Sequence, residues 1–314
     1  MKPNVLVICG PTASGKTALA VALAQRFDGE VVSADSMQVY RGMDIGTAKP
    51  TPQEMGGIVH HMLDVAQPEE AFSVARYVSM AVPIVDDILA RGKLPIIAGG
   101  TGLYVDHLIA GRQFAPFPQH SGLREALQQR VRAEGLPALR CELAQVDPEA
   151  AQRLHPNDEK RIIRALEVYH STGKTISQHN RESAALPNRY TPLTLALNYR
   201  ERPWLWARID QRVDEMMARG LEGEVRGLLD SGVPLSATSM QAIGYKEMAA
   251  ALLEGRPVQE GAEEIKLRSR QYAKRQLTWF RRNAQAHWLL WEERPDFSSA
   301  LQNATNLILA SGLQ

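Results

Sequence analysis

The stretch VLVICGPTASGKTALA, residues 5–20, constrains the fold of this chain more than any other feature. Five apolar residues lead to Gly10, and Gly15, Lys16 and Thr17 follow at the spacing of a phosphate-binding loop (P-loop), before an alanine-rich helical stretch. In this order the amides of residues 13–17 form an anion nest at a helix N-terminus, Lys16 adds positive charge and the Thr17 hydroxyl can ligate Mg²⁺. Nucleotide hydrolysis, phosphoryl transfer and diphosphate departure all use this cradle, so the motif leaves the bound group open.

Strand and helix patterns alternate along much of the chain. Apolar segments predict strands at residues 5–9, 30–34, 94–98 and 193–199. The helical patterns between them favour a parallel sheet with crossover helices, so we expect an α/β fold with a P-loop NTPase-like core. After the last of these strands, the chain is expected to be helical again through Arg282 and from about Asp296.

Between the third and fourth strands, the pattern changes to helices alone. The helix DEKRIIRALEVYHSTG is expected to be capped by Asn157 and to stop at Gly173. We therefore predict an inserted all-helical domain at residues 114–192, and a core domain made of residues 1–113 and 193–314.

Composition excludes several classes of protein. The chain has 314 residues, 44% of them hydrophobic, and no apolar run of the roughly 18 residues that a membrane span needs. MKPNVLVICG leads directly into the P-loop, which leaves no room for a cleavable signal, so a cytoplasmic location is expected. Cys9 and Cys141 are too few for a disulfide framework or a zinc site. The net charge is only +1, so binding of a polyanion requires positive charge to be concentrated locally.

Two strand ends differ in their acidic residues. LPIIAGG ends in Gly99 and Gly100 without a carboxylate, although a phosphoryl-transferring enzyme normally holds Mg²⁺ with an acidic residue at such a place. This weakens an assignment as a kinase. The strand at 30–34 is followed by Asp35, at the edge where open α/β sheets bind ligands. Asp35 is expected to face the phosphate site; a helix cap or a surface ion pair is the alternative.

Local positive charge occurs in KLRSRQYAKRQLTWFRR, residues 266–282, which holds seven Lys or Arg and no acidic residue. Spacings of four and three place one group of side chains on a single helix face: Arg268, Tyr272, Arg275, Trp279 and Arg282. Such a face can neutralise phosphates and stack on bases, or it can be a solvated face whose aromatic rings are half in the core.

Two histidines and two tryptophans are not expected to be metal ligands or catalytic groups. His60 and His61 are adjacent, which rarely suits one metal ion, so we expect structural or substrate-positioning roles. Trp204 and Trp206 are expected to be core residues.

Taken in order, eight motifs resemble those of the bacterial tRNA dimethylallyltransferase family, over residues 5 to about 290. They are GPTASGKTALA, SADSMQVYRGMDIGTAKP, FSVARY, GGTGLY, HPNDEKRIIRALE, GLEGEVRGLL, AIGYKEM and AKRQLTWFRR. The resemblance implies transfer of a dimethylallyl group from dimethylallyl diphosphate to N6 of the adenosine 3′ to the anticodon, with Mg²⁺ as cofactor. The P-loop would then cradle a diphosphate leaving group, although the motif by itself is typical of ATP binding. Val59 departs from the family, many of whose members have proline there.

The resemblance also implies roles for particular residues. Asp35 corresponds to the general base and Thr101 to a threonine between the diphosphate and the attacking nitrogen, with Lys16 and Arg212 as further catalytic groups and Thr17 as a metal ligand. The implied diphosphate-binding residues are Gly10, Thr12, Ala13, Ser14, Gly15, Lys16, Thr17, Arg161 and Arg212. The implied tRNA contacts are Asp35, Ser36, Met37, Gln38, Thr101, Arg124, Glu159, Lys160, Arg161, Ile162, Ile163, Met240, Gln241, Ala242, Ile243, Gly244, Tyr245, Ala273, Lys274, Arg275, Gln276, Leu277, Thr278, Trp279 and Phe280.

Three other functions stay open at this point. A P-loop kinase would phosphorylate a small molecule from ATP without RNA. An RNA-binding nucleotide switch would have no need of Asp35. A prenyltransferase acting on free adenine nucleotides would have little use for residues 266–282. The sequence leaves undetermined the set of tRNAs, the tolerance for other isoprenoids and the oligomeric state.

Overall fold

The protein is described by a computed structural model at residues 4–111 and 122–313. The chain divides into two compact units, Met1–Gly111 with Arg189–Gln314, and Arg112–Asn188. The predicted boundary at residues 113 and 114 lies outside the described residues, and the one at residues 192 and 193 falls inside a strand, β5 (Thr191–Tyr199).

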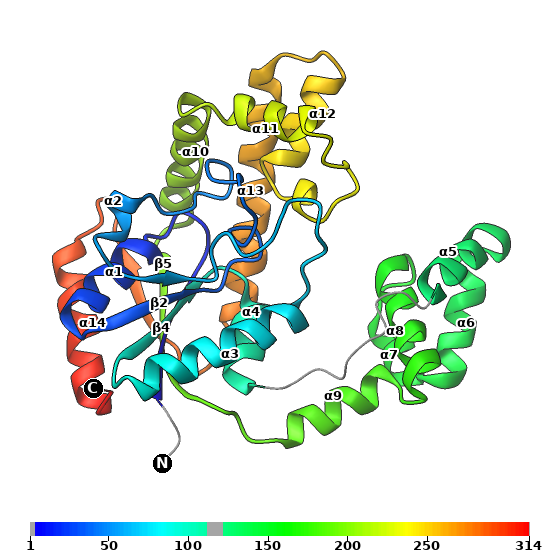
Figure 1. The fold of residues 1–314 in the computed structure, drawn as a ribbon, viewed down its shortest axis with the longest axis horizontal. Helices are drawn as coiled ribbons and strands as arrows, with labels where there is room; N and C mark the ends of the chain where they lie inside the picture. The colour runs from blue at the N-terminus through cyan, green and yellow to red at the C-terminus, as the bar shows by residue number, and fades with distance from the viewer. Residues whose placement is uncertain (1–3, 112–121, 314) are drawn as a thin grey trace. The chain divides into compact units, whose positions relative to one another are not determined.

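The larger unit is built on a parallel sheet of six strands in the order β3-β2-β4-β1-β5-β6 (Figure 1). All five strand pairs are parallel, so the carboxyl ends of the strands meet at one edge. The four predicted strands are present, and β3 and β6 are additions that the sequence patterns did not predict. The strands are β1 (Asn4–Cys9), β2 (Gly29–Ser33), β3 (His60–His61), β4 (Leu94–Gly99), β5 and β6 (His287–Trp291).

Helices cover both faces of this sheet. In β1, Val5 and Val7 belong to the core beneath α3 (Val74–Ala90) and α4 (Gly102–Ala110), because successive side chains of a strand point to opposite faces. Leu6 and Ile8 instead pack in the core with α1 (Lys16–Arg26) and α14 (Phe297–Ser311). The sheet is therefore buried on both sides, as parallel sheets require.

The segment after β5 adds further helices to the larger unit. Arg270 on α13 donates to Asp210 on α10 at 2.6 Å, which ties these two long helices together. The additional elements of this unit are α2 (Pro52–Met55), α10 (Arg202–Ala218), α11 (Leu221–Asp230), the short 3₁₀ helix η1 (Ser239–Gln241), α12 (Tyr245–Leu253) and α13 (Val258–Phe280).

The smaller unit has a core of its own. Leu139, Leu143 and Leu166 have no exposed surface and pack with neighbouring apolar residues of the same unit. Its helices are α5 (Leu123–Glu134), α6 (Leu136–Val146), α7 (Pro148–Arg153), α8 (Glu159–Thr172) and α9 (Ile176–Ala185). In the larger unit, the amides of Arg189 and Tyr190 both donate to the carbonyl oxygen of Ile109, at 3.1 and 3.2 Å, so the chain leaves and rejoins this unit at one place.

Local details correct two expectations. Asp158, rather than Asn157, caps α8: its carboxylate accepts the amide of Arg161, because it is the residue directly before the helix. Gly173 ends that helix in the left-handed conformation, as predicted. Trp206 is 40% exposed, so its assignment to the core was wrong; α10 turns this side chain outward, and Arg202 lies over its ring.

Candidate active site

A cavity of about 770 Å³ lies at the sheet edge where the strands end. The P-loop, Asp35 after β2, Gly100 after β4 and the terminal residues of β5 and β6, Tyr199 and Trp291, all line it. Residues of α10 and α13 also contribute to its walls. Ligands of open α/β sheets bind at this edge, so the cavity is the candidate active site.

The P-loop has the backbone of an anion nest. Ala13 and Gly15 lie in the left-handed region, at φ 63° and 82°, and this conformation makes neighbouring amides converge. Gly10 has φ 144°, and a Cβ there would lie 2.4 Å from the carbonyl oxygen of Leu197. Glycine at position 10 is therefore required by the close approach of β5 as well as by φ.

Two side chains from distant parts of the larger unit hold the P-loop. The amide of Thr12 donates to Gln276 Oε1 at 2.9 Å, and the indole Nε1 of Trp291 donates to the carbonyl oxygen of Ser14 at 2.8 Å. Sequence reasoning missed Trp291. A signal existed in the apolar run HWLLW, because a parallel strand there would end at this same edge.

Lys16 and Arg212 bring positive charge to the cavity. Lys16 Nζ donates to the carbonyl oxygen of Pro11 at 2.7 Å. Burial, followed by the positive charge of Arg212, lowers the pKa of Lys16 to about 8. Burial also lowers the pKa of Arg212, and the negative charge of Asp35 opposes this effect at both residues. A bound anion would offset the electrostatic repulsion between Lys16 and Arg212.

Asp35 sits at the turn after β2. Its Oδ1 accepts the amides of Met37 at 2.9 Å and Gln38 at 3.4 Å, so the turn fixes the carboxylate. No helix begins at this turn, so Asp35 is not a helix cap, and its carboxylate lines the cavity. The Thr101 hydroxyl bonds to the amide of the adjoining Ser36 at 3.0 Å. Thr101 itself lies beside the lining residues.

Close packing explains the glycines of GGTG. A Cβ on Gly99 would lie 2.2 Å from the carbonyl oxygen of Ala34, and one on Gly102 would lie 2.2 Å from the indole ring of Trp279. These positions let the end of β4 approach β2 and let α13 approach α4. The motif therefore brings Asp35, Thr101 and α13 close together.

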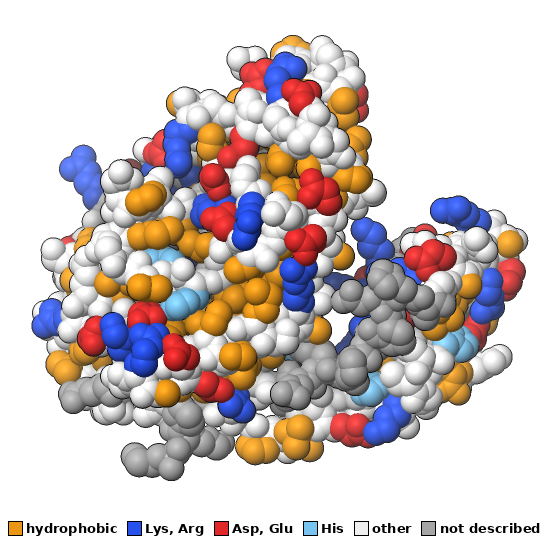
Figure 2. Space-filling view, in the orientation of Figure 1, with side chains coloured by type: hydrophobic (Ala, Val, Ile, Leu, Met, Phe, Trp, Pro, Cys, Tyr) orange, Lys and Arg blue, Asp and Glu red, His pale blue; other side chains and the backbone are white. Residues whose placement is uncertain are grey.

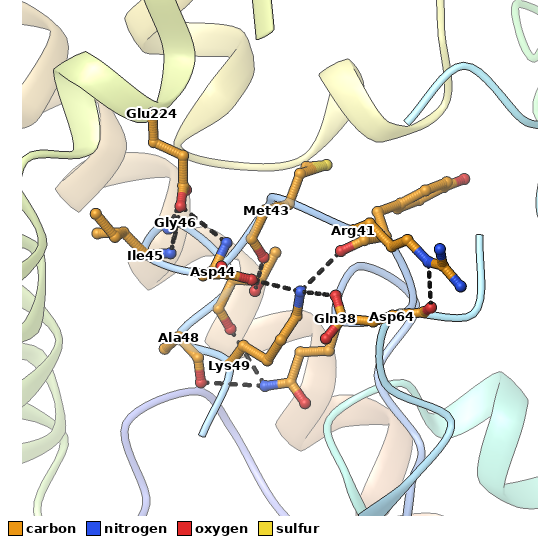
Figure 3. A network of polar contacts seen from close by, with 12 residues as sticks. Gln38, Arg41, Met43, Asp44, Ile45, Gly46, Ala48, Lys49, Asp64 and Glu224 are labelled. Atoms are coloured by element: carbon orange, nitrogen blue, oxygen red, sulfur yellow. Dashed lines mark hydrogen bonds and ion pairs between the residues drawn. The ribbon is translucent and has the colours of Figure 1, made fainter. Parts of the chain in front are cut away.

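A network of polar contacts shapes the part of the cavity wall formed by residues 46–50 (Figure 3). The carboxylate of Glu224 on α11 accepts the amides of Asp44, Ile45 and Gly46, at 2.8–3.1 Å. Lys49 Nζ, 6% exposed, bonds to the carboxylate of Asp44 at 2.6 Å. Glu224 was not singled out from the sequence, since its three amide partners lie about 180 residues away.

Other members of the same network hold the segment that follows Asp35. Lys49 Nζ also bonds to the carboxylate of Asp64 at 2.6 Å. Gln38 donates to the carbonyl oxygens of Thr47 and Ala48 and accepts from Ser33, so its side chain is occupied within the protein.

The basic face of α13 combines cations with aromatic rings. The guanidinium of Arg275 lies 5.5 Å from the ring centre of Tyr272, and that of Arg282 lies 3.9 Å from the ring centre of Trp279. Burial and then the charge of Asp35 raise the pKa of Tyr272 to about 12, so its phenol stays protonated beside the cavity. On the molecular face in Figure 2, acidic and basic side chains are interspersed over the larger unit, in keeping with the low net charge.

Several implied tRNA contacts are buried. Met240 and Tyr245 have at most 1% exposed surface, and the Tyr245 hydroxyl donates to Glu224. Gln241, Ala242 and Ile243 line the cavity. Gln241 is exposed and Ile243 half-buried, whereas Ala242, Gly244, Ala273, Gln276, Phe280, Ile162 and Ile163 are buried. The buried side chains that do not line the cavity are placed to support neighbouring exposed residues.

The smaller unit holds the remaining implied residues. Arg161 is 74% exposed on its side chain and pairs with Asp158 at 3.0 Å, and Arg124 pairs with Glu167 at 2.9 Å. Glu159 and Lys160 are exposed in the first turn of α8. These contacts describe this unit by itself.

The described residues also bear on metal binding and membrane insertion. They contain no group of three His, Cys, Asp or Glu side chains that could hold a metal ion, and none of their helices is long and apolar enough to cross a membrane. His61 Nε2 instead bonds to the Glu30 carboxylate at 2.8 Å, in keeping with a structural role.

The sequence was compared with known families. The model of the IPP transferase family matches residues 38–283, which is most of the chain. This chain belongs to the IPP transferase family. Two relatives extend the match through the P-loop. The chain is 48% identical over 310 residues to tRNA dimethylallyltransferase 1 of Trichlorobacter lovleyi, covering 99% of this chain and 100% of the relative. It is 47% identical over 304 residues to the tRNA dimethylallyltransferase of Caldanaerobacter subterraneus, covering 96% of each.

Solved structures of IPP transferases share the fold. A full-length tRNA isopentenylpyrophosphate transferase from Bacillus halodurans superposes with a TM-score of 0.73 at 42% identity, covering 99% of this chain and 96% of its own. A eukaryotic dimethylallyltransferase acting on tRNA superposes with a TM-score of 0.83 at 31% identity, covering 98% of this chain and 78% of its own. The P-loop NTPase-like α/β fold predicted from the sequence is thereby confirmed.

Proposed function

We propose that this IPP transferase moves a dimethylallyl group from dimethylallyl diphosphate to N6 of the adenosine 3′ to the anticodon in tRNA, releasing diphosphate. The observation that carries the proposal is the meeting of a phosphate cradle, two cations and one carboxylate in a single cavity. The cations are Lys16 and Arg212, and the carboxylate is Asp35. Because tRNA is the acceptor, the reaction is expected in the cytoplasm.

The cations serve the leaving group. As the bond between C1 and the diphosphate oxygen breaks, its electron pair moves onto the diphosphate, and the allylic carbon becomes positively charged. The P-loop amides, Lys16 and Arg212 stabilise the growing negative charge. Their convergence favours departure of diphosphate over attack by water on a phosphate.

Asp35 serves the nucleophile. The N6 lone pair of adenine is delocalised into the ring, so the amine attacks C1 effectively only when a proton leaves as the new C–N bond forms. The Asp35 carboxylate accepts that proton, and the turn at Met37 keeps it in place. Thr101, bonded to Ser36 beside Asp35, would help to orient the diphosphate oxygen or the amine.

Mg²⁺ fits the diphosphate site through its donor chemistry. Thr17 provides a hydroxyl at the start of α1, next to the loop amides. Mg²⁺ prefers oxygen ligands and commonly takes most of them from substrate phosphates and water. The ion would supply further charge neutralisation to the leaving group, with Thr17 as the protein ligand.

RNA would be held by α13 and by the smaller unit. An adenine in a stacked anticodon loop must leave the stack before its N6 can reach a carbon electrophile inside a cavity. The exposed cations of α13 can neutralise phosphates around the flipped base. Arg124, Lys160 and Arg161 are the smaller unit's candidates for the same task.

One experiment separates this function from its alternatives. The protein is incubated with Mg²⁺, radiolabelled dimethylallyl diphosphate and a tRNA with adenosine 3′ to the anticodon; a tRNA with guanosine there is the matched control. Label is expected only on the adenosine tRNA. Labelling of AMP instead would indicate a prenyltransferase of free nucleotides. A parallel reaction with labelled ATP and no RNA tests for a kinase, and phosphate transfer there would contradict the proposal.

A further inference from the structure

Gln276 is a buried polar residue in the basic segment of α13. Its side chain is 5% exposed, whereas its neighbours Lys274 and Arg275 are exposed. The resemblance places Gln276 among the tRNA contacts. Gln276 lines the cavity, but both polar atoms of its amide are bonded within the protein, so its role is sought in those partners.

Those partners are the two loops that form the reaction site. Gln276 Oε1 accepts the amide of Thr12 at 2.9 Å, and Gln276 Nε2 donates to the carbonyl oxygen of Gly100 at 2.9 Å. The donor at Thr12 and the acceptor at Gly100 determine which way the amide points. One side chain thereby joins the P-loop to the loop after β4.

Gln276 packs closely against the backbone at Gly100. A Cβ on Gly100 would lie 2.3 Å from Gln276 Nε2, so glycine at position 100 is what allows the amide to reach the backbone. The bond to Gly100 is buried, and the bond from Thr12 is partly buried at the cavity wall. Losing the side chain amide would leave the carbonyl of Gly100 and the amide of Thr12 without these partners, which is costly in a buried site.

One of the two bridged loops belongs to the proposed diphosphate site, and the other lies beside the proposed base, Asp35. Thr12 belongs to the loop that contains Lys16, where the diphosphate would sit. Gly100 precedes Thr101, which is bonded to Ser36 beside Asp35. The distance between these loops sets the distance between the leaving group and the amine that attacks C1, and transfer rates are sensitive to such alignment.

We propose that Gln276 is a positioning residue that fixes the P-loop against the loop at Gly100 and Thr101, and so aligns the diphosphate with the accepting amine. The inference rests on the proposed function for the meaning of the alignment. Gln276 acts through Thr12 and Gly100 without touching RNA. Its neighbours on α13 keep the RNA-binding role.

The first test uses Gln276→Met, which keeps the length of the side chain and removes both hydrogen bonds. Affinity for inorganic diphosphate is expected to fall about tenfold, and single-turnover transfer about 10- to 100-fold. Affinity for an anticodon stem-loop RNA should stay within about threefold of the parent. Gln302→Met, the same change on the exposed face of α14, is the control. A loss of RNA affinity with unchanged diphosphate affinity, or no change in either, would overturn the proposal.

Gln276→Glu provides a second, independent readout and remains decisive where the methionine variant does not fold. A charged carboxylate repels the Gly100 carbonyl, whereas a protonated carboxyl offers one donor and one acceptor, as the amide does. The transfer rate relative to the parent at the same pH should therefore rise as the pH falls. Lys16, Asp35, Arg212, Tyr272 and Arg275 line the same cavity in the parent and in the variant, so the ratio of the two rates isolates the effect of the new carboxyl group. A ratio near one at all pH values contradicts the proposal.

Failure of the proposed function would look different. If the parent protein transferred no dimethylallyl group to tRNA, the function would be wrong. The affinity of the Gln276 variants for inorganic diphosphate would still show whether the bridge holds the P-loop.

Discussion

The Thr101 hydroxyl oxygen accepts the backbone amide hydrogen of Ser36 across 3.0 Å, which joins the end of β4 to the end of β2. The same hydroxyl lies 3.3 Å from the Ser36 hydroxyl and donates to it. Sixty-five positions separate the two residues in sequence. The loop that carries Asp35 is thus held by the loop that follows β4.

Replacing Thr101 should slow transfer without unfolding the protein. Thr101→Val keeps the shape and removes the hydroxyl, so we expect single-turnover transfer to fall about 10- to 100-fold. Thr101→Ser retains the hydroxyl and is the matched control, expected to stay within about threefold of the parent. Equal rates for the valine and serine variants would show that the hydroxyl has no part in the reaction.

Asp35→Asn tests the base directly. Asparagine keeps an oxygen that can accept the amide of Met37, and it removes the proton acceptor. Loss of general-base catalysis should lower the single-turnover rate by about 10²- to 10⁴-fold with little change in binding of either substrate. A rate within a few fold of the parent, measured with preformed enzyme–tRNA complex, would mean that Asp35 only shapes the turn.

Lys16→Ala and Arg212→Ala should act on turnover more than on binding. Both cations meet charge that grows as the C–O bond breaks, so each loss should lower kcat by about 10²- to 10³-fold. Arg202→Ala, at the start of the same helix as Arg212 and stacked on Trp206, is the control for loss of an arginine. Normal turnover of either site variant at saturating substrates is the result that rules out its role.

Diphosphate binding should depend on pH through Lys16. Its pKa of about 8 in the free protein means that the ammonium is charged below that pH and becomes neutral above it. Because the anion binds the charged form, affinity is expected to be highest below pH 8 and to fall as the pH rises through that value. Titration calorimetry with inorganic diphosphate on both sides of pH 8 measures this. Lys16→Arg keeps its charge and should remove the dependence.

Binding of tRNA should weaken steeply as salt concentration rises, because each neutralised phosphate releases counterions. Arg282→Glu, at the exposed end of the basic face, should reduce both the affinity and the slope of its dependence on salt. Arg226→Glu on α11 makes the same charge change at an exposed position outside that face and is the control. The prediction would be refuted if the tRNA affinity of the parent protein did not change with salt concentration.

Short sequence patterns predicted where the candidate site lies in the fold. The P-loop spacing, the apolar strands and Asp35 at a strand end are each visible within a few residues. They predict a cavity at the carboxyl edge, because parallel strands must end together. The cap of α8 was placed one residue too early because Asn157 and Asp158 are both good capping residues, and the choice between them depends on where the helix begins.

The contacts that hold the site were beyond sequence reasoning. Glu224 meets the amides of residues 44–46 only because α11 packs beside that loop. Gln276 was expected among the tRNA contacts, yet it is buried and bonded to Gly100, where the absence of a Cβ leaves room for its amide. Such roles depend on which distant segments become neighbours, and no local pattern of residues encodes that.

The paired hydrogen bonds from Arg189 and Tyr190 to Ile109 mean that the core closes on itself where the helical unit is attached. A segment spliced in at such a point breaks no strand pairing, because the two cut ends already lie side by side. In evolutionary terms, a chain of this design can exchange the module that meets a macromolecule while its chemistry stays intact. Recognition and reaction can then diversify at different rates within one gene.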